Sequence, residues 1–265
     1  MATKKIENCI LVPIDSTEQT VIALSQSYNL ARLTNSKIVL LNVDEGNSPS
    51  GQKPLENIPN VEVITRKGNV YEEINKVADE IKPLFIMIGL TSKITLRKVI
   101  GQNAFRMIRE SKHPVITIRG KVHRDGCKTI LLPVDLTKET REKVHHAVEL
   151  AKLFNADIRI ISILSQDNKE NENKLIAYSN QTWKYIKENG VRCTVKTLRG
   201  KDVVKMVLEY GHEVEADLIL VMSKAELSGK EFFVGTVAQR LINESDIPVL
   251  SYRPMKRKDT TAFTK

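Results

Sequence analysis

Cysteine and aromatic residues are scarce in this chain of 265 residues, of which only 5% are aromatic. The three cysteines, Cys9, Cys127 and Cys193, are far apart and odd in number, so they form neither a disulfide framework nor a metal-binding spacing. This usage favours a reducing compartment. No apolar run approaches the roughly 18 residues that a membrane-spanning helix needs, and no apolar segment follows the charged start. The sequence therefore predicts a cytoplasmic protein that makes no membrane contact.

Motifs of several enzyme classes are also missing. The chain contains no G-x-x-x-x-G-K-[ST], G-x-G-x-x-G or G-x-S-x-G, and no nucleophile stands beside a candidate base. His145 and His146 are adjacent, so they point to different faces of a helix and cannot form an i,i+4 metal pair. His123 and Cys127 have no further ligands nearby in the sequence. The sequence predicts no catalytic and no metal-binding residue.

The formal net charge of +9 is spread over the chain. Residues 1–122 hold 17 basic and 12 acidic residues, and the rest hold 24 and 20. One stretch is strongly basic, with eight Lys or Arg and one acid between Gly89 and Lys121. It is either a solvated basic face or an anion-binding face. Aromatic stacking platforms beside the basic residues are missing, so the charge alone does not favour nucleic-acid binding.

An internal repeat is visible. The segment Leu11–Thr17 returns as Leu131–Thr137, with four of seven positions identical at an offset of 120. A second segment, starting at Gly101, returns at Gly235 with eight of fifteen positions identical at an offset of 134. The repeat length indicates two whole domains rather than a solenoid. We predict domains over residues 1–122 and 123–258, followed by a flexible tail over residues 259–265.

The two halves differ by 14 residues, and 12 of these lie between the second and third predicted strands. In the second half, residues 169–189 show apolar residues at helical spacing. In the first half, residues 44–60 hold three prolines and two glycines. Proline removes a backbone donor and glycine costs backbone entropy, so no long helix fits there. The first domain is therefore predicted to lack one helix.

Short apolar runs alternate with amphipathic segments in both halves. Runs that are apolar on both faces are typical of parallel strands covered by helices. The fold class predicted is α/β, with two tandem doubly wound, Rossmann-like domains whose five-stranded sheets are mostly parallel. The first predicted helix should bury Val21, Leu24, Tyr28 and Ala31 on one face. The predicted strands cover residues 9–14, 37–43, 61–66, 84–88 and 115–118, then 130–134, 158–163, 191–198, 218–222 and 249–252.

Ligands of such folds bind beyond the carboxyl ends of the strands, where the strand order reverses. The first strand of each half ends there, in Pro13-Ile14-Asp15 and in Pro133-Val134-Asp135. A carboxylate at this place can meet the adenine or ribose edge of a ligand. It can equally cap the helix that follows, by accepting a backbone N–H. The residues leave both roles open.

These features together resemble the universal stress protein family, twice along nearly the whole chain. The resemblance is carried by the V/L-P-I/V-D strand end, by the apolar strand before the loop, and by the glycine-led helix start followed by Pro-Val. It implies a non-enzymatic stress-response protein that acts through a protein partner or a small ligand. Members commonly dimerise through the last strand, so the halves are expected to form an internal pseudo-dimer. A further homodimer stays open.

Nucleotide-binding members of the family carry a loop G-x-x-G-x9-G-[ST], whose small residues let the backbone approach phosphates at a helix start. The resemblance therefore implies ATP or another adenine nucleotide as a cofactor, or, as the alternative function, a nucleotide-hydrolysing or adenylyl-transfer enzyme on the same fold. Counted back from the last motif glycine, the loop positions are Met222, Ala225, Gly235 and Thr236 in the second half, and Ile88, Thr91, Gly101 and Gln102 in the first. The base and ribose side would be formed by Pro133, Val134, Asp135 and Ile163, or in the first half by Pro13, Ile14, Asp15 and Val43. With two motif positions changed instead of three, the second half is expected to bind more strongly.

Overall fold

The computed structural model describes most of the chain, namely residues 8–14, 18–44, 61–90, 102–119, 125–137, 139–164, 169–222, 224–225, 232–233 and 236–254. Its first half contains β1 (Cys9–Ile14), α1 (Glu18–Thr34), β2 (Lys37–Asp44), β3 (Val61–Lys67), α2 (Val70–Ile81), β4 (Phe85–Gly89), α3 (Gln102–Glu110) and β5 (Val115–Ile118).

The second half repeats this order and adds one long helix and a short hairpin. Its elements are β6 (Thr129–Val134), α4 (Glu139–Phe154), β7 (Asp157–Leu164), α5 (Lys169–Glu188), β8 (Cys193–Arg199), α6 (Val203–Glu213), β9 (Leu218–Met222), β10 (Lys224–Ala225), β11 (Phe232–Phe233), α7 (Thr236–Glu244) and β12 (Val249–Tyr252). Each predicted strand is present, with ends that differ by at most two residues. The antiparallel hairpin of β10 and β11 was not predicted.

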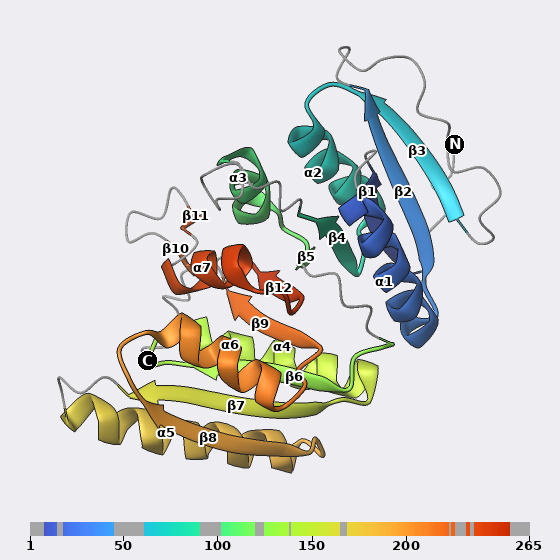
Figure 1. Cartoon of the computed structure of the whole chain (residues 1–265). Helices are drawn as coiled ribbons and strands as arrows, with labels where there is room; N and C mark the ends of the chain where they lie inside the picture. The colour runs from blue at the N-terminus through green and yellow to red at the C-terminus, as the bar shows by residue number, and fades with distance from the viewer. Residues whose placement is uncertain are drawn as a thin grey trace, which may run out of the picture.

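The predicted pair of five-stranded sheets is joined edge to edge into one ten-stranded sheet, in the order β3-β2-β1-β4-β5-β12-β9-β6-β7-β8. In this ten-stranded sheet, the strands of each half run parallel to one another. In both halves the first strand lies in the middle and the chain winds outward to either side, so each half is doubly wound as predicted. Figure 1 shows the two halves with their helices against the shared sheet.

The two halves meet where β5 and β12 pair antiparallel (Figure 1). Ile116 lies opposite Leu250, and these two residues are equivalent at the 134-residue offset. The pairs on either side are symmetric too. Val115 lies opposite Ser251 and Thr117 opposite Val249, and Val115 is equivalent to Val249 as Thr117 is to Ser251. The register is therefore that of a pseudo-two-fold axis through the Ile116–Leu250 pair. This confirms the predicted pairing of the two last strands.

The core lies on both faces of the sheet, which explains the nearly continuous apolar strands. Ile10 and Val12 face one cluster, under helices α1, α4 and α5, whereas Cys9 and Leu11 face the other, under α2, α3, α6 and α7. All four are buried to 1% exposure or less. Successive side chains along a strand point to opposite faces of the sheet, so residues at both odd and even positions must be apolar.

One predicted core residue of α1 is on the surface. Val21 is 66% exposed, whereas Leu24 and Ala31 are buried as predicted. The buried stripe instead includes the polar residues Thr20 and Ser27. Ser27 Oγ donates to the Leu24 carbonyl at 2.6 Å, so the hydroxyl is satisfied inside the helix. An apolar pattern alone cannot find a stripe that contains such residues.

Some predictions concern residues outside the described part of the chain. These are the loop over residues 45–60, the domain boundary between residues 122 and 123, and the tail over residues 259–265. The added helix of the second half is present as α5, over residues 169–188. Among the described helices, none is long and apolar enough to cross a membrane.

Candidate functional site

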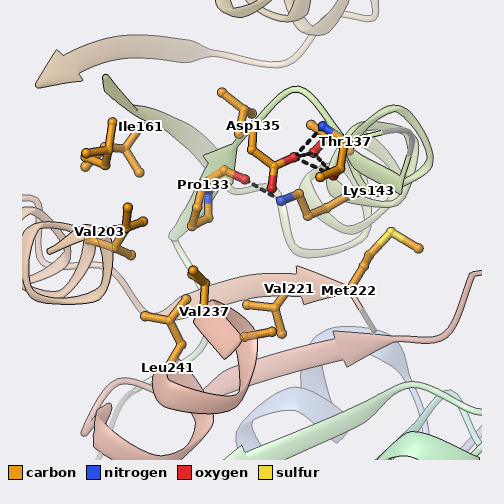
Figure 2. A pocket seen from close by; sticks show the side chains of 15 residues that line it. Pro133, Asp135, Thr137, Lys143, Ile161, Val203, Val221, Met222, Val237 and Leu241 are labelled. Atoms are coloured by element: carbon orange, nitrogen blue, oxygen red, sulfur yellow. Dashed lines mark hydrogen bonds between the residues drawn. The ribbon is translucent and has the colours of Figure 1, made fainter. Parts of the chain in front are cut away.

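A crevice opens in the second half at the point where the strand order reverses, between β6 and β9. It has a volume of about 200 Å³. The carboxyl ends of three parallel strands form its base, and the first turns of α6 and α7 form its side (Figure 2). The residues in or directly after the strands that line it are Pro133, Val134, Asp135, Ile161, Ile163, Val221 and Met222, and the helix residues include Lys143, Val203, Val207, Val237, Ala238 and Leu241.

One end of the crevice is polar. The Asp135 carboxylate accepts a hydrogen bond from the Thr137 backbone N–H at 2.9 Å. It also accepts from the hydroxyls of Thr137 and Thr140, both at 2.5 Å. Thr137 precedes α4, so the carboxylate fixes the turn between β6 and that helix, and it also lines the crevice. The structure thus shows Asp135 fixing the turn before the helix, which is close to the predicted capping role, and its contact with a ligand stays a prediction.

The pKa of Asp135 lies below its ordinary value of 3.8. Burial is the largest influence and opposes ionisation, but the charge of Lys143 and the hydrogen bonds from Thr137 and Thr140 together outweigh it. The turn that forms the polar end of the crevice is therefore built around an ionised carboxylate at neutral pH.

A pH dependence of stability follows from this shift. A carboxyl whose pKa is lowered in the folded state stabilises the fold above its unfolded pKa, and this contribution is lost as the pH falls through the folded value. Asp135→Asn should therefore be less stable than the wild type near pH 6, and the difference should shrink below about pH 3.8. Urea unfolding of both proteins across this range measures it. A difference that grows on acidification would contradict the assignment.

Lys143 lines the crevice and was not predicted from the sequence. Its side chain is only 8% exposed, and its Nζ donates to the Pro133 carbonyl at 2.5 Å, at the floor of the crevice (Figure 2). The repeat offers the signal that could have found it. At the offset of 120, the first half carries Ala23 in this place, also in the helix after the first strand. A buried lysine at a position where the other half carries alanine indicates that this side chain has a specific role.

The rest of the crevice is apolar. Ile161, Val207 and Leu241 are nearly fully buried behind it, and Met222 is 6% exposed at the end of β9. Val237, in the first turn of α7, is 40% exposed at the mouth. Such a slot fits a flat apolar group, with the polar end beside β6 supplying orientation.

An ion-pair link holds the two helices of the side wall together. Arg240 on α7 contacts Asp202, the residue that caps the start of α6, at 3.1 Å, and Glu244 at 2.8 Å. In the first half, Asn69 caps the corresponding helix α2. Arg106, the equivalent of Arg240, contacts Glu110 within its own helix α3. In the second half, the ion pair between Arg240 and Asp202 therefore joins the two helices of the crevice wall. The neutral Asn69 cannot form such an ion pair in the first half.

The structure brings together five of the predicted site residues, namely Pro133, Val134, Asp135, Ile163 and Met222. Thr236 is the first residue of α7, and Ala225 ends β10. In the first half, Pro13 and Ile14 end β1 and Val43 lies near the end of β2. Asp15, Gly101 and Gly235 lie outside the described residues.

The loop alignment of the first half needs a correction. In the sheet, Leu11 lies opposite Ile86, and its equivalent Leu131 lies opposite Ile219. Three residues further along each strand, Gly89 corresponds to Met222. Counting back from Gly101 had placed Ile88 there. The first half thus keeps a glycine at the first loop position, and its loop is one residue shorter. Counting across an unaligned loop cannot detect such a deletion.

Together, the parallel strands wound to both sides define a Rossmann-like α/β protein, and its crevice lies at the reversal point where ligands of such folds bind. Residues 126–253, which make up most of the second half, match the model of the universal stress protein family. The chain is also 25% identical to a universal stress protein of Methanocaldococcus jannaschii over 145 residues, which cover 49% of this chain and 85% of the relative.

Solved structures share the fold over most of the chain. A universal stress protein of Archaeoglobus fulgidus has a TM-score of 0.74 at 20% identity, covering 93% of this chain and 98% of its own. A protein of unknown function from Pseudomonas aeruginosa has a TM-score of 0.69 at 18% identity, covering 93% and 92%. These likenesses extend the shared fold to the first half.

Proposed function

We propose that this protein is a non-enzymatic, cytoplasmic stress-response protein that binds a purine nucleotide in the crevice of its second half. The observation that carries the proposal is the crevice itself, an apolar slot at the strand-order reversal with an ionised carboxylate and a buried lysine at one end. The flat base would lie between Ile163 and the side wall, and the ribose would face the β6 end. An adenine nucleotide is the ligand that the family resemblance implies.

The volume of the crevice limits how the ligand would sit. About 200 Å³ is less than the 300–1,000 Å³ of sites that enclose a drug-sized ligand. The base and part of the ribose would be enclosed, and the phosphates would lie at the mouth beside the first turn of α7. That helix starts with Thr236, the residue type of the family motif, whereas α3 starts with Gln102. Free backbone amides at a helix start favour anions.

Titration calorimetry of the full chain with ATP tests the proposal. We expect one site with micromolar affinity, and no turnover of ATP that survives repurification of the protein. Turnover that persists at constant specific activity through several columns would instead indicate the enzyme that the family fold allows. Nucleotide binding would be contradicted if millimolar ATP gave no heat of binding and released no purine already bound to the purified protein.

A further inference from the structure

The ten-stranded sheet ends in two edge strands that differ in charge. β3 lies at one end of the strand order and β8 at the other, and Figure 1 shows them at opposite ends of the sheet. The two are equivalent in the repeat, because β3 pairs with β2 in the same register as β8 with β7. Lys196 therefore stands at the middle of β8 where β3 carries Ile64. A lysine on an edge strand is a common protection against pairing with another chain, and the middle of β3 lacks it.

One face of β3 is also less covered than the equivalent face of β8. In the second half α5 packs against β8, and Val195 is half-buried against the core cluster on that face. The described helices of the first half include no counterpart of α5, and Val63, the equivalent of Val195, is 45% exposed. An exposed valine on an edge strand loses contact with water when a further strand pairs beside it, which favours such pairing.

The backbone of β3 directs hydrogen-bonding groups to its outer side. Successive residues of a strand point their N–H and C=O groups to opposite edges. Gly68, which follows β3, donates its N–H to the Asp44 carbonyl of β2 at 3.1 Å, so the even-numbered residues face inward. The odd-numbered residues from Val61 to Lys67 therefore face outward. Within the described residues, no strand pairs with this edge.

The sequence of β3, Val-Glu-Val-Ile-Thr-Arg-Lys, is complementary to itself in charge. When two copies pair antiparallel with Ile64 opposite Ile64, Glu62 of each copy lies opposite Arg66 of the other. The neighbouring registers that keep the backbone bonds would instead place Ile64 opposite one of these charges. Arg66 already contacts Glu80 of α2 at 2.7 Å, which holds its side chain on the face where Glu62 of the second copy would lie. Opposite charges across a strand pair stabilise it.

We propose that this chain forms a homodimer in which two copies of β3 pair antiparallel about Ile64 and join their sheets. Val63 of each copy then exchanges backbone hydrogen bonds with Thr65 of the other, and the two side chains pack as a cross-strand pair. The same surface is used by both copies, so the assembly closes as a dimer. A single strand pair buries little surface, so the dimer forms reversibly. The crevice lies in the other half, and the inference is therefore independent of the proposed ligand.

Sedimentation equilibrium of the full chain tests the proposal. We expect the average mass to rise from 30.0 kDa toward twice that value with increasing concentration. Glu62→Arg places like charges opposite each other in both charge pairs, so it should weaken the dimer by about tenfold. Adding Arg66→Glu to this variant makes the charges opposite again and should restore association. Glu188→Arg makes the same change at the exposed end of α5, and this matched control should associate as the wild type does.

A second variant removes a backbone donor instead of a charge. Val63→Pro deletes an outward-facing N–H, at a place where an edge strand tolerates proline, and should abolish association. A mass that stays at that of one chain up to millimolar concentration overturns the proposal, and this measurement needs no variant. A dimer that survives both Glu62→Arg and Val63→Pro, with the melting temperatures showing folded proteins, overturns the role of β3. Loss with Val63→Pro alone overturns the register about Ile64.

Discussion

Replacing Leu250 by alanine is expected to lower the free energy of unfolding by about 2–5 kcal/mol, the range for large-to-small changes in a packed core. Leu250 is fully buried at the centre of the β5–β12 junction, opposite Ile116. The change removes apolar contacts from a site that both halves enclose, and the sheet on either side restricts relaxation. Urea unfolding followed by circular dichroism measures the loss.

A matched control and a second variant locate the effect at the junction. Leu153→Ala changes a leucine that is 43% exposed on α4, so it should cost only about 0.5 kcal/mol. Ile116→Ala should show a loss like that of Leu250→Ala, and the double variant should lose less than the two together, because the residues share one contact. Full additivity, or a cost no larger than that of the exposed leucine, would show that the halves do not depend on this pair.

Ile163→Trp is expected to weaken ATP binding by more than about tenfold, which corresponds to 1.4 kcal/mol. Ile163 is half-buried at the end of β7 and lines the crevice, so an indole there would occupy the space proposed for the base. Val43 is its equivalent at the end of β2, also half-buried. Val43→Trp makes a similar change in the first half and should leave the affinity within error.

Calorimetry on the two variants decides which half binds. Thermal unfolding of both proteins shows whether either substitution has damaged the fold, and a comparable melting temperature makes the pair a fair comparison. Equal loss of affinity from both variants would indicate two comparable sites, and loss only in Val43→Trp would move the site to the first half.

The strands of this fold were predictable because each is a run of apolar residues buried on both faces. The pairing of β5 with β12 was predictable because the two segments are equivalent, short and apolar, and an exposed strand edge favours pairing. The burial of Thr20 and Ser27 in α1 was not, since both are polar residues that leave no apolar signal, and the Ser27 hydroxyl bonds within the helix. The β10–β11 hairpin has only two residues in each strand, too few for a periodic pattern.

The candidate site shows the same division. The location of Asp135 and its neighbours could be predicted because they stand at a strand end, which this fold places at the crevice whatever the ligand. Lys143 lies on a helix eight residues later, and only the packing of α4 over the end of β6 brings its Nζ to the Pro133 carbonyl. The position of Gly89 follows from the register of β4 against β1. Counting residues across a loop whose length differs between the halves does not reveal this register.

We propose above that the ligand binds in the crevice beside β6, β7 and β9. Methyl-resolved NMR of the full chain, titrated with ATP, tests it most directly, because it locates even weak binding residue by residue. We expect the methyl signals of Ile163, Val203 and Val237 to shift with a common affinity, while those of Val43 stay in place. Shifts confined to the first half, or none at saturating ATP, would contradict it.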